Sequence, residues 1–280
     1  MVRIAISSDN HLDVNQVDPA AALAMQAQYL QDHSVQYYFY AGDLFNDFTQ
    51  TRQYMTDLQH RLADRVHVYY IAGNHDLLQY ASYDQIEHLS APGYLHRHYV
   101  DLPGTNWRMI GNNGWYDYSF STYRDDSIAV RQWKRVYWLD SEIEQPGDDQ
   151  ERMNNVLSQV TAQLAAAKDA GKRVLFLTHF APRYELLAPR PAGVNTPRRE
   201  RFYQMITAMM GSDRLGDLLE STGNVKYAFY GHLHGIHPPL EHNGVTYLNQ
   251  AVGVRNKRIN EWQQDDFTAQ WQSSLRILDL

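Results

Sequence analysis

Residues 66–76 read VHVYYIAGNHD. Valine, isoleucine and tyrosine favour strands, and the apolar run is nearly continuous, as in a strand that is covered on both faces. Gly73 and Asn74 favour a turn directly after it. The fragment therefore predicts a buried strand whose carboxyl end carries the polar side chains of Asn74, His75 and Asp76.

The same arrangement recurs along the chain, because four further strand-like segments end in polar clusters. These clusters are Ser8-Asp9-Asn10-His11, Gly42-Asp43, Thr178-His179 and Gly231-His232-Leu233-His234. Glycine precedes three of the five clusters, and we expect it there because the backbone must turn sharply and approach closely.

Strands and helices alternate in the expected secondary structure. The segments that predict strands are residues 2–7, 35–41, 66–72, 107–111, 174–178, 226–230 and 245–249. Helical spacing marks residues 20–33, the positions of Tyr54, Leu58 and Leu62, and those of Met153, Val156, Val160 and Leu164. This alternation predicts a layered α/β sandwich, and the chain length suits a single domain over residues 1–280.

Two segments interrupt this alternation and are interpreted as insertions that face the substrate. Residues 115–152 are aromatic and acidic, and residues 182–201 hold four prolines and five arginines. Both are too long and irregular for plain connections. The first is expected to pack as a small cap; its aromatic side chains could also stack on a nucleobase.

Composition restricts the class of protein and the chemistry of any metal site. The chain has no cysteine, so a metal must be held by oxygen and imidazole nitrogen. A net charge of −7 argues against a protein that coats duplex nucleic acid. The sequence shows neither a secretory signal nor a membrane span, so we expect a cytoplasmic protein.

The five clusters predict a metal site. Loops at the carboxyl ends of strands in an open α/β sheet converge on one crevice. Carboxylate, imidazole and carboxamide ligands together suit Mn, Fe or Zn better than Mg or Ca. An aspartate between two such sites can bridge them, and two metal ions can clamp the attacking and leaving oxygens of an in-line displacement.

The order of these clusters resembles the calcineurin-like metallophosphoesterases. That family's pattern is Asp-x-His, Gly-Asp, Gly-Asn-His-Asp/Glu, a lone His and Gly-His-x-His, and all five blocks occur here between Asp9 and His234. The resemblance implies a four-layer α-β-β-α sandwich with mixed sheets and an inserted cap-like segment. It also implies a hydrolase in which a metal-bridging hydroxide attacks a phosphate mono- or diester of a small molecule.

The resemblance assigns roles to individual residues. Asp9, His11 and His234 would hold the first metal ion, and Asn74, His179 and His232 the second. Asp43 would bridge the two ions. His75 would be no ligand; it would protonate the leaving oxygen or stabilise charge on the phosphoryl group. Asp76 would orient its motif.

The sequence departs from the phosphoprotein phosphatase branch, which continues Gly-Asp with x-x-Asp-Arg-Gly. Here Gly42-Asp43 is followed by Leu44-Phe45-Asn46-Asp47-Phe48, so the aspartate is displaced and the arginine is absent. This weakens the interpretation as a protein phosphatase. It also leaves open whether Asn46 or Asp47 supports His75.

The sequence indicates the residues that contact substrate less clearly than it indicates the metal ligands. Asn112 and Asn113 follow a predicted strand and could touch substrate or form a turn. Arg198 and Arg199 lie among five arginines and two glutamates, in either a solvated loop or a site for a second anionic group of the substrate.

Three other functions compete with the small-molecule phosphoesterase. A metal-dependent nuclease would need a long basic groove, and no long basic tract is visible. A phosphoprotein phosphatase is disfavoured by the motif after Asp43. A non-catalytic scaffold should lack some ligands or the acid, whereas His75 and all seven expected ligands are present.

Overall fold

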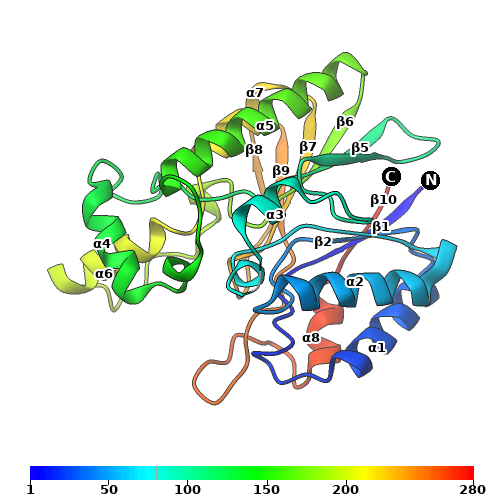
Figure 1. The fold of residues 1–280 in the computed structure, drawn as a ribbon, viewed down its shortest axis with the longest axis horizontal. Helices are drawn as coiled ribbons and strands as arrows, with labels where there is room; N and C mark the ends of the chain where they lie inside the picture. Colours follow the sequence, from blue (N-terminus) through cyan, green and yellow to red (C-terminus); the bar gives the residue numbers. More distant parts are fainter. Residues whose placement is uncertain (80) are drawn as a thin grey trace.

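The computed structural model describes residues 1–79 and 81–280 and contains two β-sheets (Figure 1). In the first sheet β1 (Arg3–Ser7), β2 (Tyr37–Tyr40) and β3 (His67–Tyr70) run parallel, and β10 (Arg276–Asp279) joins β1 antiparallel. The strand order is β10-β1-β2-β3. The amino-terminal sequence thus forms the centre of a mixed sheet, as its apolar composition predicts.

The second sheet has the order β4-β5-β6-β7-β9-β8. Its parallel strands are β5 (Trp107–Gly111), β6 (Arg173–Leu177), β7 (Val225–Tyr230) and β9 (Val245–Asn249). Both edges are antiparallel, formed by β4 (His98–Asp101) and β8 (Leu240–His242). Every strand predicted from the sequence is present.

The two sheets face each other across an apolar layer. Ile4, Ile6 and Phe39 from the first sheet belong to the same buried cluster as Leu175 and Phe229 from the second. Such side chains exclude water from the interface and hold the sheets together. The chain ends meet here, because the backbones of residues 2 and 280 form two hydrogen bonds.

Helices cover the outer faces and complete four layers, which confirms the expected sandwich (Figure 1). The first sheet is covered by α1 (Pro19–Asp32), α2 (Phe48–Leu62) and α8 (Phe267–Ser274), and the second by α5 (Asp149–Asp169) and α7 (Asp213–Ser221). Asp148 and Glu151 start α5 with a capping box, which satisfies otherwise free amide groups.

The two predicted insertions contain helices whose bounds were not predicted from the sequence. Residues 115–152 include α4 (Ser127–Tyr137), a short 3₁₀ helix (Leu139–Glu142) and the first turn of α5. Residues 182–201 lead into α6 (Pro197–Thr207), and α3 (Tyr83–His88) lies between β3 and β4. The predicted insertion boundaries at residues 152 and 201 therefore fall inside helices. Among the described residues, no helix is long and apolar enough to cross a membrane.

Candidate metal centre

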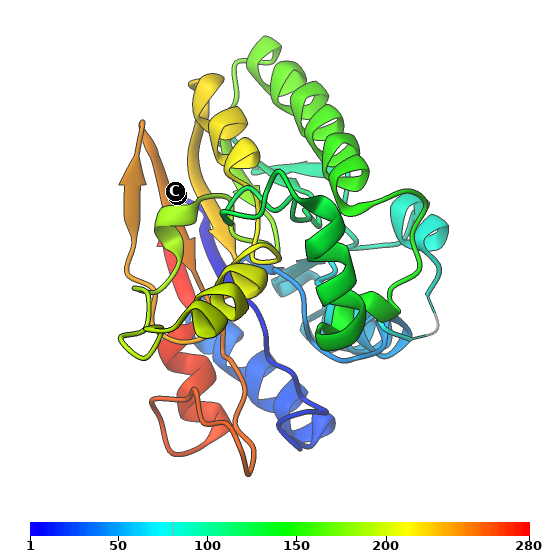
Figure 2. The same cartoon turned by 90° about the vertical axis from the view of Figure 1, so that its left-hand side faces the viewer.

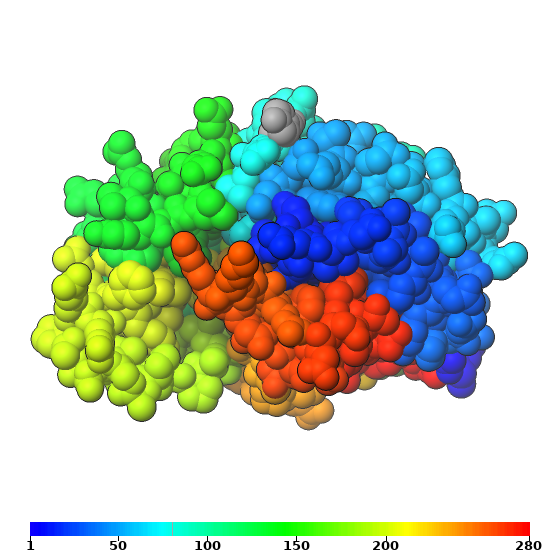
Figure 3. All heavy atoms as spheres, turned by 90° about the horizontal axis from the view of Figure 1, so that it is seen from below, coloured from blue at the N-terminus to red at the C-terminus, as the bar shows by residue number. Residues whose placement is uncertain are grey.

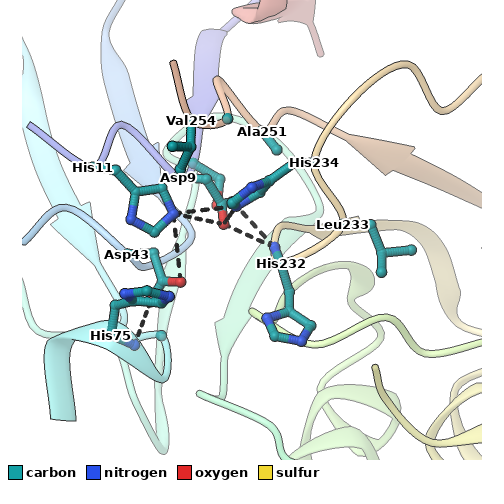
Figure 4. A network of polar contacts seen from close by, with 12 residues as sticks. Asp9, His11, Asp43, His75, His232, Leu233, His234, Ala251 and Val254 are labelled. Atoms are coloured by element: carbon teal, nitrogen blue, oxygen red, sulfur yellow. Dashed lines mark hydrogen bonds and ion pairs between the residues drawn. The ribbon is translucent and has the colours of Figure 1, made fainter. Parts of the chain in front are cut away.

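The polar clusters meet where the parallel strands of both sheets end. Backbone hydrogen bonds join them in pairs: Asp9 N–H donates to the Gly42 carbonyl at 2.9 Å, and Gly231 N–H donates to the His179 carbonyl at 2.9 Å. Because the two sheets pack face to face, the carboxyl ends of their parallel strands lie close together. Side chains that are far apart in sequence therefore face one another (Figure 4).

The first group of possible ligands is Asp9, His11 and His234, whose ligand atoms all lie within 4.8 Å of one another. His11 Nε2 is 3.1 Å from His234 Nε2, and His234 Nε2 is 3.2 Å from Asp9 Oδ1. Asp9 and His11 are fully buried, and His234 is partly exposed. These three side chains are the predicted ligands of the first ion.

The second group is Asp43, His179 and His232, with ligand atoms equally close together. His179 Nε2 lies 3.2 Å from Asp43 Oδ2 and 3.0 Å from Asn74 Oδ1. Asp43 Oδ2 is also 3.8 Å from His11 Nε2 in the first group. Asp43 therefore stands between the two groups, as a bridging ligand must.

In three of the histidines, the ring nitrogen that faces away from the centre donates a hydrogen bond, which fixes the orientation of the ring. His179 Nδ1–H donates to the Ala41 carbonyl at 2.8 Å, and His232 Nε2–H donates to the Met209 carbonyl at 3.2 Å. His234 Nδ1–H donates to Glu261 at 2.7 Å. A histidine whose outer nitrogen is a donor presents its other nitrogen to a metal. The donor set thus fits a pair of cations.

The charges of the centre also suit cations. Burial favours the neutral form of Asp9, but the hydrogen bond with His234 and the charge of His179 lower its pKa. Burial also favours the neutral form of the histidines and so lowers their pKa, yet the contact with Asp43 raises the pKa of His179 to about 9. Asp9 and Glu261 raise that of His234 to about 10. The carboxylates thus hold positive charge at the positions where metal ions would bind.

The backbone of the clusters is unusual in two respects: several residues have positive φ, and the chain segments approach each other closely at Gly73. Asp9, His11, Asp43 and His232 all have positive φ, between 43° and 63°. A side chain on Gly73 would collide with the Asp43 carboxylate and the His179 ring. Only glycine permits this close approach, which confirms the reason expected for glycine before the third cluster.

His75 lies beside the centre, with its ring 4.7 Å from that of His11. Its Nδ1–H donates to Asn46 Oδ1 at 2.7 Å, and its backbone N–H donates to Asp43 at 2.8 Å. Asp47 caps α2 by accepting from the Thr49 amide, so its side chain serves the helix. Of the two candidates, Asn46 is the residue that supports His75.

Asp76 joins the second and third clusters. Its Oδ2 accepts hydrogen bonds from the backbone amides of Asp43 and Gly73, both at 2.8 Å, and its Oδ1 accepts one from the Thr51 hydroxyl at 2.6 Å. Burial, together with the charge of Asp43, raises the pKa of Asp76 to about 7. This arrangement agrees with the orienting role expected for Asp76.

The family model for calcineurin-like phosphoesterases matches residues 2–235. The chain belongs to the calcineurin-like phosphoesterase family. The family comprises phosphoester hydrolases that depend on a dinuclear metal centre, which confirms the resemblance indicated by the five clusters.

One solved structure with a TM-score above 0.5 supports the fold of a calcineurin-like phosphoesterase. A dimetal phosphatase from Danio rerio superposes with a TM-score of 0.53 at 14% identity, covering 89% of this chain and 86% of that one. GAP50, the anchor in the inner membrane complex of Plasmodium, gives a TM-score of 0.48 at 10% identity, with coverages of 91% and 76%. A search of curated proteins gave no match.

Two acidic residues of this phosphoesterase contact the expected ligands but were not predicted. Asp140 Oδ1 accepts a hydrogen bond from Asn74 Nδ2 at 2.8 Å, which turns the amide oxygen of Asn74 toward His179. Glu261 orients His234 and also accepts from the Val254 amide at 2.7 Å. Neither residue lies in a motif, and the acidic character of residues 115–152 is the only signal that points toward Asp140.

Asn112 and Asn113 are buried, and protein groups take up their side-chain amides. Asn112 donates to Gln159 and accepts from the Gly114 amide, at 3.0 and 2.9 Å, and Asn113 donates to the Tyr94 hydroxyl at 2.9 Å. Asn112 thus stabilises a turn, as one of the two expectations had it, and Asn113 ties its loop to more distant parts of the chain. These bonds lend no support to the substrate contact predicted for the two residues.

Arg198 and Arg199 lie on α6, apart from the ligand clusters, and line a groove between α4 and α6. Arg199 donates to the Gly193 carbonyl at 2.9 Å. Contact of these two arginines with substrate stays a prediction.

Proposed function

We propose that this chain hydrolyses a phosphate mono- or diester of a small molecule at a dinuclear metal centre. The observation that carries the proposal is the convergence of seven ligand groups, with Asp43 between the other six, in a family of metal-dependent phosphoesterases. The donors are oxygen and imidazole nitrogen without sulfur, which favours Mn, Fe or Zn.

Each proposed ligand has a place in this centre. Asp9, His11 and His234 would hold one ion, and Asn74, His179 and His232 the other, with Asp43 shared. When bound, the two ions supply Lewis-acid activation of the phosphoryl group and of the attacking water. The outer hydrogen bonds of His179, His232 and His234 keep the protons on the ring nitrogens that face away from the centre.

His75 is proposed as the general acid. Asn46 accepts the Nδ1 proton of His75, which holds the ring edge-on to His11 and leaves Nε2 to carry the exchanging proton. The ring is only partly buried, so substrate can reach it. A positioned histidine that protonates the leaving oxygen contributes about 100-fold or more to the rate.

The test is hydrolysis of bis(p-nitrophenyl) phosphate and of p-nitrophenyl phosphate by metal-stripped protein, before and after adding Mn²⁺, Fe²⁺ or Zn²⁺. We expect turnover only with metal, and the ratio of the two rates separates diesterase from monoesterase. Asp43→Ala should bind less metal and lose turnover, whereas His75→Ala should keep its metal and lose at least about 100-fold in kcat.

The matched control is His60→Ala, which removes an exposed histidine on α2. It should retain both metal content and turnover. Absence of turnover with every metal in protein that carries two ions per chain would reject the proposed hydrolysis, and full activity of His75→Ala would reject the role of His75.

A further inference from the structure

A groove of about 840 Å³ is lined by residues of α4 and α6, the helices of the two insertions. Figure 2 shows these two helices side by side. These helices contact each other, although their residues are far apart in sequence. The volume lies within the range of sites for organic ligands, about 300–1,000 Å³. The groove is therefore large enough for much more than a phosphate group.

The groove adjoins the metal centre through a second cavity of about 290 Å³. His232 and His234 line this second cavity, and Pro191, Tyr203 and Ile206 line both it and the groove. Figure 3 shows the hollow between the yellow segment that contains α6 and the orange segment that follows β9. A molecule with its phosphate at the metal centre can thus extend toward the groove.

One part of the groove is an aromatic surface. Trp133 and Phe202 meet edge to face with ring centroids 5.4 Å apart, and Trp133 packs against Tyr137 at 5.3 Å. Tyr137 is 64% exposed and Phe202 is 52% exposed. Exposed rings that are fixed by their neighbours form a stacking surface for a planar ligand group.

The other part of the groove is basic. Arg198, Arg199 and Arg201 line it, and none of the acidic residues that the structure describes does. Within residues 1–79 and 81–280 none of these three guanidinium groups has a carboxylate partner, whereas the nearby Arg190 pairs with Glu200. In a chain of net charge −7, three uncompensated arginines at one groove favour an anionic ligand.

We propose that this groove binds the part of the substrate away from the scissile phosphate. That part carries an aromatic ring and a second anionic group, such as a further phosphate. The ring stacks against Tyr137 and Phe202, and the anion pairs with Arg198 and Arg201. This inference rests on the proposed function and deepens it, because it names the substrate as an aromatic phosphoester with more than one negative group.

The probe is α,β-methylene-ADP, which holds an aromatic ring and two phosphoryl groups joined through carbon. Its dissociation constant for the Mn²⁺-loaded protein is measured by calorimetry and compared with that of inorganic phosphate, which fits the metal centre alone. We expect the double variant R198A/R201A, and separately Tyr137→Ala, to weaken binding of the analogue about ten-fold. Binding of phosphate should change much less.

Arg135→Ala is the matched control, because Arg135 is an exposed arginine on α4 that does not line the groove. It should leave both dissociation constants unchanged. Groove variants that bind the analogue within two-fold of the original protein, or that lose phosphate and analogue equally, would overturn the inference. Hydrolysis of the chromogenic diester is measured in parallel, so failure of the proposed function is seen separately from failure of the groove.

Discussion

At the scale of single residues, the orientation of His75 decides whether it can serve as an acid. Asn46 is the side chain bonded to its Nδ1, and Asp47 is used to cap α2. We expect Asn46→Ala to lower kcat about ten-fold, the value of one hydrogen bond to a charged group (about 1.5 kcal/mol), without loss of metal. Steady-state kinetics and metal analysis of the purified variant measure both.

Asp47→Ala is the control for this prediction. It removes the cap of α2 and should cost about 1 kcal/mol in the free energy of unfolding while kcat stays near its original value. A larger kcat loss in Asp47→Ala than in Asn46→Ala would show that the second aspartate of the motif, and not the asparagine, supports His75.

Glu261 also acts through a histidine, since it accepts the Nδ1 proton of His234 at 2.7 Å. Removing such an outer partner typically costs about 10–100-fold in metal affinity. We therefore expect Glu261→Ala to weaken Mn²⁺ binding by that factor in competition with a chromophoric chelator. Glu241→Ala, which changes an exposed glutamate on β8, is the control and should bind as before. Equal affinities in the two variants would contradict this role.

The sequence predicted all seven grouped side chains because the family motifs mark them, but it could not predict their outer partners. Asp140 lies 66 positions from Asn74, and Glu261 lies 27 positions from His234. No local pattern connects such residues, because packing of the insertion and of the loop after β9 brings them together. The side chains of Asn112 and Asn113 were ambiguous for the same reason.

At the scale of elements, the central strands and one edge strand, β3, were predictable, and the other three edge strands were not. The strands found from the sequence are mostly buried on both faces and therefore form apolar runs. The three missed strands, β4, β8 and β10, all lie at sheet edges. β4 is mostly exposed and the other two are partly exposed, so their composition resembles that of loops. β10 also pairs with β1 from the opposite end of the chain.

The first insertion is anchored to the sandwich through Asp149, at the start of α5. This buried carboxylate accepts hydrogen bonds from Lys134 Nζ at 2.7 Å, Trp115 Nε1 at 2.8 Å and the Tyr118 hydroxyl at 2.5 Å. Burial alone would raise the pKa of Asp149, but the charge of Lys134 and these bonds lower it. The aromatic side chains of the insertion thus form part of its core, as expected of a cap.

Asp149→Asn should destabilise the protein by about 3 kcal/mol at pH 7, because it leaves the buried Lys134 without its counter-charge. Since the folded pKa lies below the unfolded value, the stabilisation is complete above about pH 4 and is lost as pH falls through the folded pKa. The difference between the two proteins in urea denaturation should therefore shrink below pH 4. A difference that does not change with pH would indicate that packing, not charge, dominates.

At the scale of the whole molecule, the metal centre lies across the interface of the two sheets. Asp9, Asp43 and Asn74 follow strands of the first sheet, and His179 and His232 follow strands of the second. Ions bound there would link the two halves of the sandwich, in addition to the apolar layer that packs between them. Metal binding should therefore stabilise the entire fold and not only the loops.

Removal of metal tests this linkage. A ligand at 100 times its Kd stabilises the folded state by about 2.7 kcal/mol, which corresponds to a rise in Tm of roughly 5 °C for a chain of this size. We expect Tm to rise by about that amount when Mn²⁺ is added to chelator-treated protein. Asp43→Ala, which lacks the shared ligand, should show a much smaller rise. If protein that has bound two ions per chain melts at the same temperature as metal-free protein, the ions do not hold the sheets together, because binding that spans both halves must oppose their separation.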